Sequence, residues 1–208
     1  MGGVKMNKNY LAILIAGVGG QGILKAGTLL GEAALLENKK IISTEVHGMA
    51  QRGGSVVNEI KIGDVQSPLI NKGEADIILS FEPAEALRVL DKASPETYLI
   101  VNTNPIIPLT VSLGLATYPD LNLAWLKVRD IYPRLWLVDA RKIALEAGNS
   151  ISENVVLLGV LCSVPIFPIS TENMMKAIEN GFPPKFRELN LKAFNLGLEK
   201  GKEGISNL

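Results

Sequence analysis

Four glycines and one glutamine stand close together near the start of the sequence, in the order Gly17-x-Gly19-Gly20-Gln21-Gly22. They follow an apolar run and precede a helix-like pattern. A chain that leaves a strand on clustered glycines and turns into a helix points free backbone N–H groups at one place, where the helix dipole adds partial positive charge. Glycine is needed because a Cβ would obstruct both the tight turn and the close approach of a ligand. The pattern predicts a site for a phosphate or carboxylate, and the amide of Gln21 can bind a ligand or a neighbouring chain.

A second polar segment, HGMAQRGG, spans residues 47–54 and begins where the second predicted strand ends. Ligands of doubly wound sheets collect at the carboxyl ends of strands. Arg52 precedes Gly53 and Gly54, which cannot shield it, so its guanidinium either contacts a phosphate or carboxylate or is simply solvated. His47 is a weak candidate proton carrier, because no Ser, Asp or Cys partner stands at a recognisable catalytic spacing. No residue is therefore assigned as catalytic.

The glycine cluster has two further interpretations. A Gly-x-Gly-x-x-Gly pattern between a strand and a helix, with Glu45 near the end of the next strand, is typical of NAD or flavin dinucleotide sites. Alternatively, the glycines serve only to pack a helix tightly against a strand. Glu82 either faces a ligand crevice or caps a helix, and residues 102–108 are expected to form a polar turn stiffened by two prolines.

Short apolar runs alternate with amphipathic segments along the chain. This alternation predicts an α/β fold: a Rossmann-like, mostly parallel sheet flanked by helices, followed by a helical C-terminal region. ADIILSF and RLWLVDA are expected to be buried on both faces, and Thr171 is expected to cap a helix. The predicted strands are 10–16, 40–46, 56–62, 76–81, 98–102, 115–118 and 135–139, and the predicted helices are 20–36, 83–90, 122–130, 140–147, 153–164, 171–180 and 186–199.

The composition excludes several functions. The 21 basic and 21 acidic side chains cancel, which argues against nucleic-acid binding. Cys162, the only cysteine, can hold neither a disulfide nor a cluster, and we expect it to be a small buried core residue. With His47 as the only histidine, no metal site is expected. We see neither a signal peptide nor a membrane span, and we expect a cytoplasmic protein.

Three segments in order carry a resemblance to a known family: GVGGQGILKAGTLLGEAA, HGMAQRGGSVVNEIKIG and EADIILSFEPAEALR. They resemble the gamma-type domain of 2-oxoacid:ferredoxin oxidoreductases, and the HGMAQRGG form is most similar to the indolepyruvate branch. The resemblance runs from about Tyr10 to about Gly197. It implies a single gamma-type domain over residues 1–208, with its core at about residues 10–197.

This resemblance implies a small subunit that is inactive without a larger partner. The partner would hold thiamine diphosphate and iron–sulfur clusters and would contact ferredoxin. The complex would oxidatively decarboxylate aryl pyruvates with coenzyme A to acyl-CoA. The sequence agrees with this division, because one cysteine cannot hold a cluster and Val65 replaces the second glycine of a Gly-Asp-Gly thiamine motif.

The resemblance also suggests what the two glycine motifs contribute. The Gly17–Gly22 turn would hold an anionic group, with a coenzyme A phosphate as the natural candidate and Arg52 assisting. Gln21, His47 and Gln51 would form a wall that faces the thiamine cofactor of the partner. Gly53 and Gly54 complete the predicted set of ligand-binding residues. A free-standing NAD or flavin oxidoreductase and a ligand-free scaffold remain the alternatives.

Overall fold

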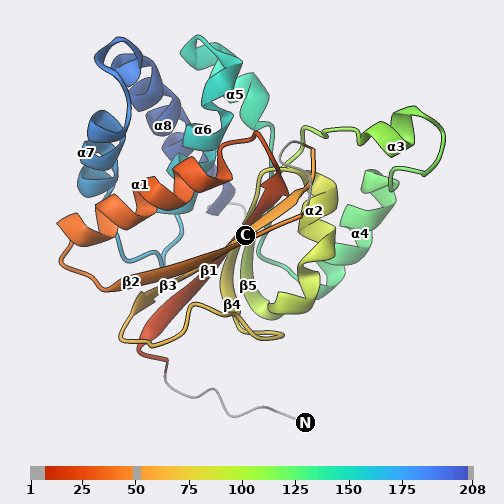
Figure 1. Cartoon of the computed structure of the whole chain (residues 1–208), viewed down its shortest axis with the longest axis horizontal. Coiled ribbons are helices and arrows are strands. Elements are labelled where there is room, and N and C mark those ends of the chain that lie inside the picture. The colour runs from red at the N-terminus through yellow and green to blue at the C-terminus, as the bar shows by residue number, and fades with distance from the viewer. Residues whose placement is uncertain (1–7, 49–52, 206–208) are drawn as a thin grey trace.

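The structure, a computed structural model, describes residues 8–48 and 53–205. Six strands form one sheet in the order β2-β3-β1-β4-β5-β6 (Figure 1). The pairs β1–β4, β4–β5 and β5–β6 are parallel, whereas β3 is antiparallel to both of its neighbours, β1 and β2. The strands are β1 (Tyr10–Val18), β2 (Ile41–His47), β3 (Ser55–Gly63), β4 (Ala75–Ser80), β5 (Ala93–Asn102) and β6 (Leu135–Val138).

Helices cover both faces of the sheet, which confirms the predicted α/β class (Figure 1). One face packs against α1, α5, α6, α7 and α8, and the other packs against α2 and α4. Two short 3-10 turns are η1 (Leu90–Lys92) and η2 (Ser150–Ser152). The helices are α1 (Ile23–Leu36), α2 (Pro83–Arg88), α3 (Leu109–Ser112), α4 (Leu121–Ile131), α5 (Ala140–Ala147), α6 (Glu153–Cys162), α7 (Thr171–Gly181) and α8 (Pro184–Ile205).

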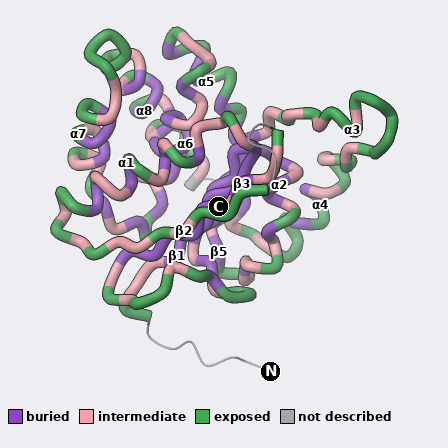
Figure 2. Tube along the Cα trace, viewed as in Figure 1, coloured by how far each residue is buried: buried purple, intermediate pink, exposed green. Residues whose placement is uncertain are grey.

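The central strands are apolar because both of their faces are covered. Ile13, Ile15 and Ile77 pack toward the layer of α1 and α6, and Leu14 and Ile78 pack toward the layer of α2 and α4. Figure 2 shows this buried centre surrounded by an exposed rim. The strands β1, β4, β5 and β6 are parallel, so their carboxyl ends lie on the same side of the sheet. The glycine turn lies on that side.

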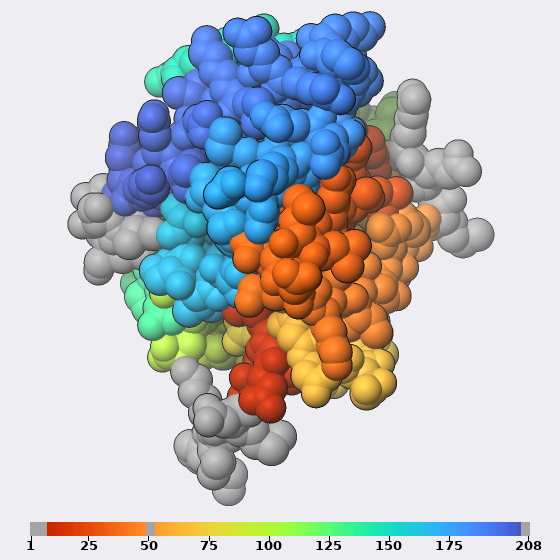
Figure 3. Space-filling view, turned by 90° about the vertical axis from the view of Figure 1, so that its left-hand side faces the viewer, coloured from red at the N-terminus to blue at the C-terminus, as the bar shows by residue number. Residues whose placement is uncertain are grey.

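Two glycines let α6 and α8 approach closely. A Cβ on Gly159 would lie 2.1 Å from the carbonyl oxygen of Phe194, and a Cβ on Gly197 would lie 2.1 Å from that of Val156. The two helices therefore touch backbone to backbone. In the space-filling view of Figure 3 the lighter blue segment, which contains α7, packs directly against α1 in orange.

Several sequence expectations are wrong in detail. No strand forms at residues 115–118, because this apolar run follows the left-handed Gly114 and leaves Leu115 77% exposed without a sheet neighbour. The preceding segment forms α3, which the sequence analysis did not predict. Ser170, rather than Thr171, caps α7, since its hydroxyl accepts from the N–H of Asn173 at 3.2 Å.

Two burial expectations also need correction. RLWLV is not buried on both faces, because β6 is an edge strand and Leu137 is 37% exposed. Cys162 is only partly buried, although it packs against the core. Burial against this apolar surface raises the pKa of its thiol. Among the described residues, none of the helices combines the length and the apolar character needed to cross a membrane.

Candidate functional site

The two glycine motifs meet at the carboxyl end of β1. The N–H of Gly19 donates to the carbonyl of Gly54 at 2.8 Å, and the N–H of Gly53 donates back to the carbonyl of Gly19 at 3.3 Å. These reciprocal bonds join the turn after β1 to the start of β3. Gln51 and Arg52 lie outside the described residues. The structure therefore brings together the predicted turn, His47, Gly53 and Gly54.

Gln21 binds its own chain rather than presenting its amide to the outside. Its Oε1 accepts from the N–H of Val18 at 2.8 Å, and its Nε2 donates to the carbonyl of Phe81 at 2.7 Å. The side chain thus links the ends of the parallel strands β1 and β4. Gly17 makes room for it, because a Cβ there would lie 2.7 Å from the Gln21 Oε1.

The turn leaves the start of α1 open. Gly22 is the N-cap residue at φ 81°, and none of the described side chains caps this helix. A Cβ at Gly22 would lie 2.5 Å from the amide nitrogen of Asn154, so glycine is needed there for space as well as for conformation. Gly20, at φ 106°, is exposed, and no atom of the residues that the structure describes lies within 4 Å of its Cβ position. Backbone donors at such an uncapped end suit an anion.

Two cavities flank the turn. The larger, about 670 Å³, extends between the start of α1 and the end of β2; Val18, Ile23, Leu24 and Val56 give it a largely apolar lining beside His47. The smaller, about 210 Å³, lies on the other side, where β1, β4 and β5 end, and residues of α5 and α6 complete its lining. Doubly wound sheets bind ligands at such a point.

The smaller cavity contains a polar network that the sequence analysis missed. Asn102 is 1% exposed, and its Nδ2 donates to the Phe81 carbonyl at 3.1 Å and to Glu153 at 3.2 Å. Glu153 also accepts from Nε of Arg141 at 2.8 Å, and this carboxylate raises the pKa of Arg141. The signal was the amide side chain of Asn102 directly after a buried strand. Its partners Phe81 and Glu153 stand 21 positions before it and 51 positions after it, so spacing could not reveal them.

The segment that follows Asn102 does more than form a stiff turn. The N–H of Thr103 donates to the Val138 carbonyl at 2.9 Å, and Oδ1 of Asn104 accepts from the N–H of Arg141 at 3.0 Å. These bonds connect the end of β5 to β6 and to the start of α5.

Glu82 caps α2, as one of its two interpretations predicted. Its Oε2 accepts from the N–H of Glu85 at 2.9 Å. Its Oε1 accepts from the N–H of Ile106 at 3.3 Å and from the hydroxyl of Tyr118. Burial, together with this carboxylate, raises the pKa of Tyr118. Glu82 is only 1% exposed, so it is a buried anchor and does not line the crevice.

His47 and Glu45 lie together at the end of β2. Nε2 of His47 is 3.4 Å from Oε2 of Glu45, and Nδ2 of Asn58 donates to the other oxygen, Oε1, at 3.5 Å. The strand order separates β2 from β1 by β3. A ribose-binding acid of the dinucleotide interpretation would follow a strand adjacent to β1, so the strand order does not favour that interpretation.

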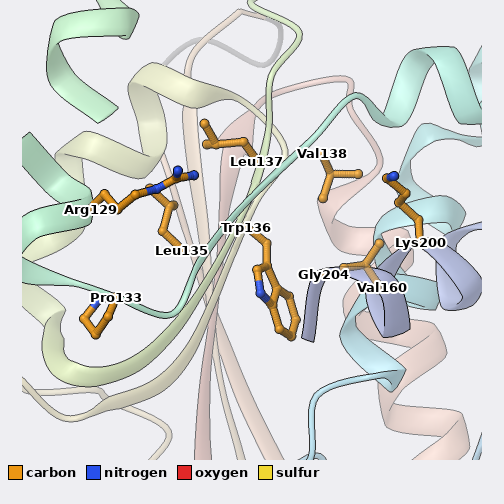
Figure 4. A pocket seen from close by; sticks show the side chains of 10 residues that line it. Arg129, Pro133, Leu135, Trp136, Leu137, Val138, Val160, Lys200 and Gly204 are labelled. Carbon is orange, nitrogen blue, oxygen red and sulfur yellow. The ribbon is translucent and has the colours of Figure 1, made fainter. Parts of the chain in front are cut away.

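A third cavity shares no lining residue with either glycine motif. It has about 400 Å³ and runs along β6, between the end of α4 and the end of α8 (Figure 4). Trp136 and Leu137 point to opposite sides of the strand in this view. The indole N–H of Trp136 is buried without a partner in the described part of the chain. Within residues 8–48 and 53–205, no group of three His, Cys, Asp or Glu could hold a metal ion.

Comparison with known proteins places this geometry in a family. Residues 12–200 match the family model described as pyruvate ferredoxin/flavodoxin oxidoreductase. The chain is 47% identical over 196 residues to indolepyruvate oxidoreductase subunit IorB of Pyrococcus horikoshii, an alignment covering 93% of this chain and 97% of that protein.

Two solved structures are also similar. The gamma subunit of a keto/oxoacid ferredoxin oxidoreductase from Geobacter sulfurreducens has a TM-score of 0.68 at 26% identity, covering 92% of this chain and 98% of that one. The 2-oxoglutarate:ferredoxin oxidoreductase of Magnetococcus marinus shares the fold with a TM-score of 0.71 at 21% identity, over 95% of this chain but only 32% of that longer chain. The chain therefore belongs to the pyruvate ferredoxin/flavodoxin oxidoreductase family, as its two glycine motifs predicted.

Proposed function

We propose that this chain is the small subunit of an indolepyruvate:ferredoxin oxidoreductase. The observation that carries the proposal is the 47% identity to a subunit of indolepyruvate oxidoreductase over nearly the full length of both chains. The junction of the two glycine motifs, Gly19 with Gly53 and Gly54, supports it, because both motifs belong to the family resemblance.

In this proposal the larger partner performs the redox chemistry. Thiamine diphosphate in the partner supplies the means to break the bond between the carbonyl carbon and the carboxylate of an aryl 2-oxo acid. Carbon dioxide would leave, the acyl group would replace the proton on the sulfur of coenzyme A, and the two released electrons would reduce ferredoxin by way of the iron–sulfur clusters that the partner would hold. This chain binds neither cofactor and is inactive alone.

We infer that the glycine turn holds an anionic group of coenzyme A. Support comes from the uncapped start of α1, the accessible face at Gly20 and the neighbouring cavity of about 670 Å³. Backbone donors at a helix start suit a phosphate, and the apolar lining suits the uncharged part of a long cofactor. Arg52 would contribute a second positive charge. His47 and Gln51 remain candidates for the wall toward the partner.

The subunit assignment is tested by purifying the tagged chain from its native host. We expect a larger, brown chain to co-purify, with thiamine diphosphate and iron detected in the complex, and we expect arylpyruvate-dependent reduction of ferredoxin. Colourless, partner-free protein would refute the assignment, and binding of NADH to the lone chain would then favour a dinucleotide enzyme.

The coenzyme A role is tested in the assembled enzyme with Arg52→Ala. Loss of one charged contact to a phosphate corresponds to about a tenfold rise in the KM for coenzyme A, with a much smaller effect on the KM for the 2-oxo acid. Arg129→Ala, at the remote cavity along β6, is the matched control. Unchanged values of both Michaelis constants and of turnover in the Arg52 variant would contradict this role.

A further inference from the structure

Residues 106–126 form a projection that we name the apolar arm. It contains α3 and the first turns of α4, and it stands away from the sheet (Figure 1). No residue of α3 is buried, and Figure 2 shows this part of the trace as mostly exposed. Six large aliphatic side chains of the arm are between 47% and 77% exposed: Ile107, Leu109, Leu113, Leu115, Leu123 and Leu126.

The apolar arm also has almost no charge. Asp120 is its only charged side chain, whereas charged residues make up 20% of the whole sequence. That carboxylate is already used to cap α4, since it accepts from the N–H groups of Asn122 at 3.0 Å and Leu123 at 3.2 Å. Isolated exposed leucines need no explanation, but six exposed aliphatic side chains gathered on one nearly uncharged segment mark a candidate interaction site.

The arm is anchored rather than loosely attached. Near its start, the N–H of Ile106 donates to Glu82, and near its middle the hydroxyl of Tyr118 donates to the same carboxylate. Trp125 and Val128 of α4 are buried in the core beneath it. The exposed aliphatic side chains are therefore held on the outside of an ordered support, which lowers the entropic cost of binding a partner.

Three observations indicate what covers the arm. Ile106 lines the smaller cavity at the carboxyl ends of the strands, so the arm begins at the rim of the candidate site. The same fold makes up 32% of a longer chain in the Magnetococcus marinus enzyme, so it occurs there beside a much larger remainder. The absence of charge requires an apolar, uncharged partner face, because a charged group pressed against the arm would lose water without gaining a counter-charge.

We propose that the apolar arm is the docking surface for the larger, thiamine diphosphate-binding subunit, an inference that rests on the proposed function. The partner contributes an uncharged groove of aliphatic or aromatic side chains that receives Leu109 and Leu126. Docking there places the partner at the rim of the cavity that contains Asn102 and Arg141.

The test compares charged substitutions on and off the arm in the native-host complex. The arm variant is Leu109→Asp/Leu126→Asp, at positions 72% and 68% exposed. The control is Leu35→Asp/Leu145→Asp, at positions 69% and 59% exposed on α1 and α5. Because all four side chains are exposed, each purified variant should keep the wild-type Tm. If Leu109→Asp/Leu126→Asp unfolds, the single variant Leu109→Asp takes its place.

We expect the control to bind as much of the thiamine-containing subunit as wild type does. The arm variant should bind no more than about a tenth of that amount. Equal retention by the arm variant would overturn the docking surface while leaving the proposed function intact. If the wild-type chain itself recovers no thiamine-containing subunit, the proposed function fails and the inference fails with it. A wild-type dimer that the arm variant converts to a monomer, with the larger subunit still bound, would assign the arm to a second copy and also overturn the proposal.

Discussion

Gln21 holds two backbone groups that belong to different strands. It accepts from the N–H of Val18 in β1 and donates to the carbonyl of Phe81 just after β4. The glutamine thus supports the turn from within, and the surface available to a ligand consists of the backbone around Gly20.

Substitution of Gln21 by alanine tests this structural role. Gln21→Ala removes both bonds and leaves the N–H of Val18 without this partner, so we expect a loss of about 1–3 kcal/mol in the free energy of unfolding. Denaturant titration measures it. Gln66→Ala, at an exposed position, should change stability by less than about 0.5 kcal/mol. A similar loss in both variants would show that the two hydrogen bonds of Gln21 contribute little.

Glu74 is the carboxylate whose charge is most strongly supported by its neighbours. Burial opposes its ionisation, but hydrogen bonds from Lys61 at 2.6 Å, from the Tyr10 hydroxyl at 2.7 Å and from the N–H of Asn71 at 2.6 Å outweigh that effect. The pKa of Glu74 falls to about 2 as a result. The same carboxylate, aided by burial, raises the pKa of Tyr10 to about 12.

This lowered pKa predicts a pH dependence. A folded-state pKa below the unfolded value stabilises the protein above about pH 4.5, and the stabilisation is lost as pH falls toward about 2. The shift corresponds to about 3 kcal/mol. We expect unfolding free energies measured across this range to decline less steeply in Glu74→Gln. Asp64→Asn, which removes the exposed Lys40–Asp64 pair, is the control; a profile for Glu74→Gln that matches wild type would contradict the prediction.

The close contact of α6 and α8 depends on glycine. Gly197→Ala would put a methyl group 2.1 Å from the Val156 carbonyl oxygen, and we expect it to lower stability by at least about 2 kcal/mol. Gly204→Ala lies on the same helix but meets Trp136 at 3.6 Å, an ordinary contact, so the better helix propensity of alanine should stabilise it by up to about 1 kcal/mol. Thermal unfolding distinguishes them. Equal Tm values for the two variants would contradict the requirement for glycine at position 197.

Local patterns predicted most elements, because period and flanking glycines or prolines act over a few residues. The runs that became β1, β4 and α5 are examples, and so is the glycine turn. The insertion of β3 between β1 and β2 was not predictable, since strand pairing depends on distant partners. Residues 115–118 resembled a strand because they are apolar, yet they belong to an exposed surface. The polar network of Asn102, Glu153 and Arg141 also joins distant parts of the sequence. The site was therefore predicted at its glycine motifs but not at these three residues.

At the scale of the whole molecule, charge is balanced and the proposed docking surface is apolar. The chain has 21 basic and 21 acidic side chains, and Asp120 alone is charged within the apolar arm. Ionic strength screens charge pairs but not apolar contacts. The arm should therefore bind its partner with little dependence on salt.

This expectation can be measured on the wild-type complex. Between about 0.05 M and about 0.5 M NaCl we expect the Kd of the two subunits to change by less than about threefold. A decrease in affinity of tenfold or more would point to an electrostatic interface elsewhere on the surface. The Leu35→Asp/Leu145→Asp variant should show the same flat dependence as wild type.

The short strand β6 also affects how copies of this molecule behave at high concentration. A sheet edge offers unpaired backbone groups, and two such edges can join into a continuous sheet that grows into aggregates. Here the edge is only four residues long, and Arg129 and Lys200 flank it (Figure 4). Two copies brought together along β6 could form only a few backbone hydrogen bonds, because the strand is four residues long. The β6 edge is thus a poor template for a sheet shared between copies, whereas the apolar arm remains free for a partner.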